Sequence, residues 1–161
     1  MTTHSEKDAC DLLDADHRTV KKLFKSFDEL AGSKSRTTSA KRREIAQQIC
    51  HELTIHAQIE EEIFYPQLRA AIKETDLLAE ALVEHATAKE LIAQIEEAQE
   101  ADETFDAKVT VLGEYIDHHV KEERTQIFPK ARTARGLDLM AMRTQLESRK
   151  EELKAEIYAS A

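Results

Sequence analysis

Apolar residues recur at steps of three and four along five stretches of the chain, and this period predicts α-helices with one buried face. The five stripes are Leu13, His17, Val20, Phe24 and Phe27; Ile45, Ile49, Leu53, His56, Glu60 and Ile63; Leu78, Leu82, His85, Ile92 and Ile95; Leu112, Ile116, His119, Glu123 and Ile127; and Leu139, Met142, Leu146, Leu153 and Ile157. The first stripe predicts a helix over about residues 8–31. The second helix begins near Ser39, and Thr75 or Asp76 is the expected N-cap of the third.

Pro66 interrupts the second stripe. Proline lacks an amide hydrogen, and its ring clashes with the carbonyl four residues earlier, which here belongs to Glu62. We therefore expect the second helix to kink or break at this point, with residues 67–73 forming a separate helical segment.

The first four stripes each carry a histidine on the apolar face. At about 1.5 Å of rise per residue, the four histidines lie at one height if successive helices run up and down and the second helix ends near the proline. The sequence therefore predicts an all-α fold, an up-down-up-down four-helix bundle over about residues 8–132. An additional C-terminal helix is expected over about residues 137–158, within a single domain that spans residues 1–161.

Composition supports helices and excludes several classes of function. The 161 residues include only three glycines and two prolines, which favours helix over an all-β fold. The net charge is −9 with acids and bases interleaved, so nucleic acid is not an expected partner. No apolar run approaches ~18 residues, so no membrane association is expected. The polar N-terminus and the two unpatterned cysteines indicate a cytoplasmic protein.

Two segments have nearly the same form. Residues 56–66 read HAQIEEEIFYP and residues 119–129 read HVKEERTQIFP, so each has His-x-x-x-Glu followed by an aromatic and a proline. The alignment selects His119 rather than its neighbour His118, and the phase of the apolar stripe makes the same choice. A single His-x-x-x-Glu pair is expected by chance in so acidic a chain, but two copies in register with the core are not.

The remaining two bundle helices are also related to each other. HRTVKKLFKSF from His17 aligns with HATAKELIAQI from His85. Positions i and i+4 share one helical face, so each His-x-x-x-Glu pair points into the bundle. The expected inward set is His17, His56, Glu60, His85, His119 and Glu123.

This inward set predicts a site for two metal ions. Burying two unpaired carboxylates would cost several kcal/mol each, and a pair of divalent cations removes that cost. Imidazole and carboxylate donors suit iron, and also manganese or zinc. Because neutral imidazole is the binding form, acidic pH should weaken the site.

Other polar and aromatic residues near the motifs have two interpretations each. Glu61 and Glu62 turn off the phase of Glu60 and are expected on a solvated face. Tyr115 lies one turn before His119 and either hydrogen-bonds a bound ligand or is a plain core tyrosine. Phe64 and Ile127, one turn beyond the glutamates, either line a dry pocket or pack in the core; they are further members of the two motif segments.

The spacing of the six residues resembles the hemerythrin-like family, the HHE cation-binding domains, over roughly residues 8–132. The resemblance implies a four-helix bundle with a non-heme di-iron centre. It also implies His17 and His56 on one iron, His85 and His119 on the other, and bridging carboxylates from the two motif glutamates. Lys89 stands where oxygen-carrying hemerythrins have a second histidine, so the pattern is closer to bacterial HHE and iron-centre repair proteins.

Two functions follow from the resemblance. The first is a di-iron protein that binds, senses or reacts with oxygen, nitric oxide or peroxide; the alternative is an iron-storage, iron-donor or iron-centre repair protein in stress response. A third interpretation, from the residues alone, is a metal-free helical interaction module. The chain has no separate acid–base constellation, so the sequence leaves open whether the protein is an enzyme.

Overall fold

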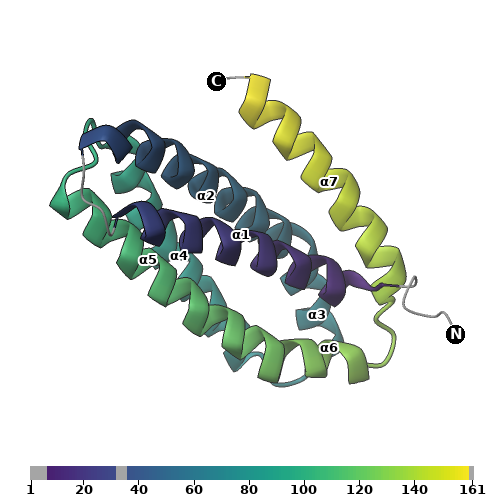
Figure 1. Ribbon diagram of the computed structural model, residues 1–161. Coiled ribbons are helices and arrows are strands. Elements are labelled where there is room, and N and C mark those ends of the chain that lie inside the picture. The colour runs from purple at the N-terminus through teal and green to yellow at the C-terminus, as the bar shows by residue number, and fades with distance from the viewer. Residues whose placement is uncertain (1–6, 32–35, 160–161) are drawn as a thin grey trace, which may run out of the picture.

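The computed structural model describes residues 7–31 and 36–159. In these ranges it consists of helices joined by short loops, with no strand. Four long helices form the bundle: α1 (Ala9–Ala31), α2 (Ser39–Ile59), α4 (Asp76–Glu97) and α5 (Glu103–Glu122). The shorter elements are η2 (Arg36–Thr38), η3 (Glu60–Phe64), α3 (Tyr65–Ala71), η4 (Glu123–Ile127) and α6 (Phe128–Thr133), and the chain closes with α7 (Leu139–Ala159). Successive long helices run antiparallel (Figure 1), so the predicted up-down-up-down bundle with an additional C-terminal helix is confirmed.

The apolar core consists of two clusters. One, packed between the four long helices, includes Val20, Phe27 and Ile92. The other, which extends to α3, α6 and α7, includes Leu13 and Phe64. Each such buried side chain contributes about 1.5–3 kcal/mol relative to an exposed one.

The proline effect takes a different form from the expected break. Residues 60–64 form a π-helical turn in which the amide of Tyr65 donates to the carbonyl of Glu60, five residues earlier. Pro66 then lies in the first turn of α3, which follows without a gap. The separate segment predicted over 67–73 is therefore present as this short helix, but with the bounds Tyr65–Ala71. The wider turn changes the position of the carbonyls that the proline ring would meet.

The same device occurs in the second copy of the motif. η4 is also a π-helical turn, with the amide of Phe128 bonded to the carbonyl of Glu123, and Pro129 follows in the first turn of α6. Each π-helical turn therefore begins at the glutamate of a His-x-x-x-Glu pair.

The C-terminal helix belongs to the packed structure. α7 packs against α1, α2 and the η3 turn, and lies along one side of the bundle (Figure 1). It buries Met142, Leu146 and Leu153. Within the described chain, no helix is both long and apolar enough to span a bilayer.

One member of the predicted stripes is misplaced. Leu82 is exposed, whereas its neighbour Ala81 is buried. Between Leu78 and Ile92, the buried face of α4 includes the small residues Ala81 and Ala88. The predicted stripe counted only large apolar residues, so it took Leu82 instead of Ala81.

Candidate metal centre

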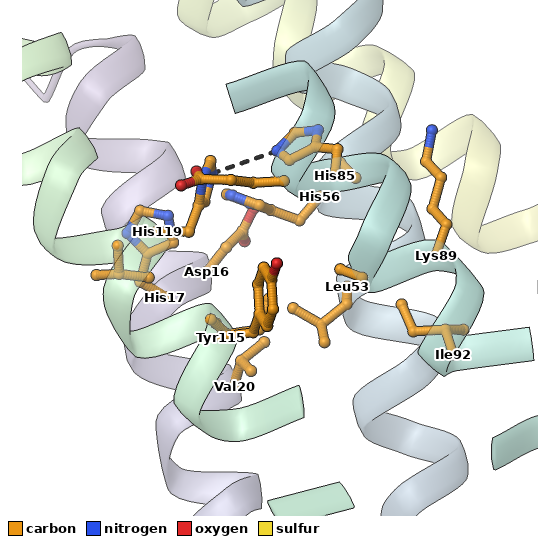
Figure 2. Close-up of a pocket in the computed structure, with 15 residues that line it drawn as sticks. Asp16, His17, Val20, Leu53, His56, His85, Lys89, Ile92, Tyr115 and His119 are labelled. Atoms are coloured by element: carbon orange, nitrogen blue, oxygen red, sulfur yellow. Dashed lines mark hydrogen bonds and ion pairs between the residues drawn. The ribbon is translucent and has the colours of Figure 1, made fainter. Parts of the chain in front are cut away.

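The structure brings all six predicted inward residues together in the middle of the bundle. The contributing elements are α1 for His17, the end of α2 for His56, α4 for His85, the end of α5 for His119, and the first residues of the two π-helical turns for Glu60 and Glu123. The histidines are at most 6% exposed and the two glutamates 0%. Figure 2 shows the four imidazoles gathered together, and all four line one pocket.

The first donor group contains His17, His56, Glu60 and Glu123, whose donor atoms all lie within 4.8 Å of one another. The Nε2 atom of His17 is 3.0 Å from Oε1 of Glu123, and Nε2 of His56 is 3.2 Å from Oε2 of Glu60. Within the described residues, these four buried atoms have no hydrogen-bond partner. They face a common point at short range without the geometry of hydrogen bonds.

The second donor group contains His85, His119 and Glu60. Nε2 of His85 lies 3.1 Å from Oε1 of Glu60 and 3.3 Å from Nε2 of His119. Oε2 of Glu123 is 3.5 Å from Nε2 of His119. Each glutamate thus presents one oxygen to each group, which is the arrangement of a bridging carboxylate.

This donor set fits a pair of divalent cations. Leaving a buried polar atom without a partner costs about 1–3 kcal/mol, and more for a charged group. Two imidazole nitrogens and two carboxylate oxygens in the first group, and two imidazole nitrogens and one carboxylate oxygen in the second, suit iron, manganese or zinc. The residues would hold the ions through Nε2 of each histidine and both oxygens of each glutamate.

Burial and charge act in opposite directions on these groups. Burial disfavours the charged form of His119, but contacts with Glu123 and Glu60 outweigh it and raise the pKa of His119 to about 12. Burial also disfavours the carboxylate of Glu60, yet the charge of His56 and the close contacts with the surrounding imidazoles lower the pKa of Glu60 well below its usual value. The carboxylates thus attract positive charge strongly, and metal binding would displace protons from the imidazoles.

Four further carboxylates, which we call the outer carboxylates, orient the imidazoles. Each accepts a contact from the Nδ1 atom of one histidine: Asp14 from His17 at 3.0 Å, Asp16 from His56 at 3.0 Å, Glu61 from His85 at 2.8 Å and Glu84 from His119 at 2.7 Å. A bond at Nδ1 fixes the ring so that Nε2 points inward, as is general for histidines that bind metals. All four rings are therefore held ready for a ligand at Nε2.

The sequence reasoning missed these partners. It places Glu61 on a solvated face, whereas the structure turns this side chain towards His85. Asp14 precedes His17 by three residues, so helical spacing could have found it. The pairs His56–Asp16 and His119–Glu84 join different helices, and no local pattern indicates them.

Tyr65 is a second residue that the sequence reasoning missed. Its hydroxyl donates to Oε2 of Glu123 at 2.5 Å, and it also lies 3.2 Å from Oε1 of Glu60 and 3.4 Å from Nε2 of His119. Burial, and then the charges of the two glutamates, raise the pKa of Tyr65 well above its ordinary value, so the hydroxyl keeps its proton. A π-helical turn sets this position, because residue i+5 from Glu60, rather than Phe64 at i+4, returns to the site.

Phe128 occupies the matching position in the other motif. It is the fifth residue after Glu123, and its ring stacks on His17 with centroids 6.0 Å apart. Phe64 and Ile127 were expected either to line a pocket or to pack in the core. Both are buried in the apolar cluster that extends to α3, α6 and α7, and neither lines the cavity described below.

A cavity of about 30 Å³ adjoins the four imidazoles. Its apolar wall consists of Val20, Leu53, Ala57, Ala88, Ile92, Ile116 and Val120. Tyr115 also lines this cavity (Figure 2) and is partly exposed, so it is not a plain core tyrosine.

A third cluster of potential ligands lies near the surface. It consists of Glu84, His118 and Glu122. The His118 side chain is 65% exposed, and its Nε2 atom is 3.6 Å from each carboxylate. Of the two neighbours, His119 therefore lies in the buried centre and His118 lies at the surface.

The chain is similar to known proteins in sequence and in fold. Residues 8–131 match the hemerythrin HHE cation binding domain family. A crystal structure of a hemerythrin HHE cation binding domain-containing protein from Mycobacterium kansasii has a TM-score of 0.73 at 21% identity, over 93% of this chain and 89% of that one. At this identity the likeness concerns the fold.

The chain also matches part of a longer protein, a DNA nickase from Nostoc sp.. It is 30% identical over 122 residues, which make up 76% of this chain but 33% of that relative. This chain therefore spans about a third of the length of the relative it matches.

Proposed function

Because this chain belongs to the family of hemerythrin HHE cation-binding domains, we propose that it holds two iron ions and binds a small molecule such as oxygen, nitric oxide or peroxide beside them. In this proposal, His17 and His56 bind one ion and His85 and His119 the other. The two motif glutamates bridge the ions.

One observation carries the proposal. Two buried glutamates each place one oxygen beside a histidine of the first donor group and the other oxygen beside a histidine of the second pair. Four of the atoms at the first donor group have no hydrogen-bond partner within the described residues. A merely structural cluster of buried polar groups would be satisfied by hydrogen bonds.

The residues around the donor groups have distinct tasks. The outer carboxylates hold each imidazole with Nε2 inward. Tyr65 holds a proton beside Glu123 and Glu60, at the edge of the second donor group. Bound iron would supply an open coordination position and electrons for a small ligand, while the protein supplies orientation and a mostly apolar cavity.

The cavity supports the choice of ligand size. Its volume of about 30 Å³ exceeds the roughly 10–15 Å³ that one water molecule needs, so it has room for a molecule of a few atoms. A diatomic molecule or a peroxide is of this order of size, whereas an organic substrate is not. Seven of the lining side chains beyond the imidazoles are aliphatic, beside Asp16, Glu84, Lys89 and Tyr115, and this mostly apolar wall suits a weakly polar ligand.

Metal analysis with an absorption spectrum tests the proposal. We expect about two iron ions per chain and a near-ultraviolet band that changes when nitric oxide or peroxide is added. His119→Ala should reduce the iron content and the band, whereas His118→Ala should leave both unchanged, because His118 is exposed. One zinc ion per chain, or a spectrum that no small ligand alters, would contradict the proposal.

The same material separates the ligand-binding function from iron donation. A tightly held centre is expected for a ligand-binding protein. Rapid loss of iron to a chelator, together with transfer to an apo acceptor protein, would favour an iron-storage, donor or repair role instead. Retention of manganese in place of iron would revise the metal but not the geometry.

The activity named for the Nostoc relative is not extended to this chain. The matched part covers only 33% of that relative. The net charge of −9 also disfavours approach to DNA phosphates.

A further inference from the structure

A lysine of the C-terminal helix contacts one of the outer carboxylates of the candidate metal centre. Lys150 of α7 donates to Oδ1 of Asp16 on α1, and Oδ2 of Asp16 is 3.0 Å from Nδ1 of His56 on α2. Contacts therefore run without interruption from the ammonium group of α7 to a histidine that faces the first donor group.

Asp16 differs from the other outer carboxylates in its surroundings. Its side chain is 6% exposed, compared with 22%, 24% and 17% for Asp14, Glu61 and Glu84. Water can solvate the other three in part. Asp16 depends on its two protein partners, because a buried charge that loses a partner is strongly destabilised.

Cations that contact two of the other outer carboxylates come from different elements. Arg124, just after α5, lies 2.6 Å from Asp14, and Lys89 on α4 lies 2.7 Å from Glu61. Both belong to the bundle itself. Lys150 alone among these three cations comes from the helix added outside the four-helix bundle.

We propose that Lys150 is a positioning residue for His56, and that through Asp16 it determines how firmly the first donor group holds its metal ion. This inference rests on the proposed function, since it requires that the centre bind metal. Without the ammonium group, the Asp16 carboxylate would turn towards water and release the ring of His56. The His85 and His119 pair, whose outer carboxylates do not contact α7, would be unaffected.

A neighbouring contact allows this role to be separated from simple docking of α7. Arg149 binds Glu62 of the η3 turn, with distances of 2.7 and 3.3 Å. It ties the same helix to the same region but does not touch an outer carboxylate. If Lys150 acted only by holding α7 in place, loss of Arg149 would have a similar effect.

Release of iron to a ferrous chelator tests the proposal in the 161-residue chain loaded with two equivalents of ferrous iron. In Lys150→Met, we expect one of the two ions to leave about 10-fold faster than in the wild type, and the other at the wild-type rate. Lys150→Arg should restore slow release, because a guanidinium can also pair with Asp16. Arg149→Met and Lys154→Met, on the same helix, should stay within about 2-fold of the wild type.

A double-mutant cycle shows whether the effect passes through Asp16. Asp16→Asn should itself speed release of one ion, and adding Lys150→Met should then have no further effect. Independent, multiplying effects would overturn the proposed route. If Lys150→Met does not fold, Lys150→Gln repeats the test, with release expected to be faster than in the wild type.

The outcomes separate the two proposals. If the wild type takes up no iron, the proposed function fails and this inference falls with it. If the wild type holds two ions and Lys150→Met releases them at the wild-type rate, the inference alone fails. It also fails if Arg149→Met speeds release as much as Lys150→Met does.

Discussion

Two methionines on α7 offer a matched test of whether this helix is part of one cooperative fold. Met142 is 0% exposed and packs in the apolar cluster that extends from α1 to α7, whereas Met140 on the same helix is 45% exposed. Replacing each by alanine makes the same chemical change on the same helix. Any difference in stability therefore comes from burial.

The expected magnitude follows from the packing of Met142. Removing a buried methionine side chain loses about 1.5–3 kcal/mol of burial free energy. The cavity left behind brings the usual cost of Met→Ala to about 2–5 kcal/mol, so we expect about 3 kcal/mol for Met142→Ala. At ~2–4 °C per kcal/mol for a chain of this size, the melting temperature should fall by about 6–12 °C. Met140→Ala should change the unfolding free energy by less than about 0.5 kcal/mol.

Urea unfolding followed by circular dichroism measures both variants. A single transition with an unchanged slope is expected for each, with a lower midpoint for Met142→Ala. Two separate transitions, or a loss below about 1 kcal/mol for Met142→Ala, would refute the reasoning. Either result would mean that α7 folds apart from the bundle, against the prediction of a single domain over residues 1–161.

Four further perturbations have defined outcomes. Tyr65→Phe removes the hydrogen bond to Glu123 and should lower the unfolding free energy of the metal-free protein by about 1.5–3 kcal/mol in urea titrations. Ile116→Phe should narrow the cavity, so that stopped-flow absorption shows slower nitric oxide binding at unchanged iron content. Burial raises the pKa of Cys10 and Cys50 to about 12, and at pH 8 only about one thiol in ten thousand is ionised. Iodoacetamide should therefore modify neither thiol until the protein unfolds, as mass spectrometry would show. Ferrous iron at 100 times its dissociation constant should stabilise the fold by about 2.7 kcal/mol, visible as a higher melting temperature.

The π-helical turns explain why the two motifs look as they do. A histidine and a glutamate four residues apart face the same side of an ordinary α-helix. The wider turn that starts at Glu60 then brings the fifth residue, Tyr65, back to the site, and the turn that starts at Glu123 does the same for Phe128. The proline after each aromatic residue lies in the first turn of the following helix, where its missing amide is not needed.

The amino-acid sequence by itself determined the helices and the inward set of four histidines and two glutamates. Both depend on the period of the α-helix, which is a property of residues three or four apart. The alignment of the two motif copies also selected His119 rather than His118 as the inward residue. In the structure His119 lies in the buried centre and His118 lies at the surface.

The tertiary structure alone decided how those six residues are supported. Asp16 reaches His56 from another helix, Glu84 reaches His119, and Lys150 reaches Asp16 across 134 positions of the chain. Tyr65 enters the site because a π-helical turn shifts the helical phase by one residue. Such contacts depend on how the helices pack and on where a π-helical turn replaces an α-helical one. A pattern of apolar residues at steps of three and four does not specify either feature.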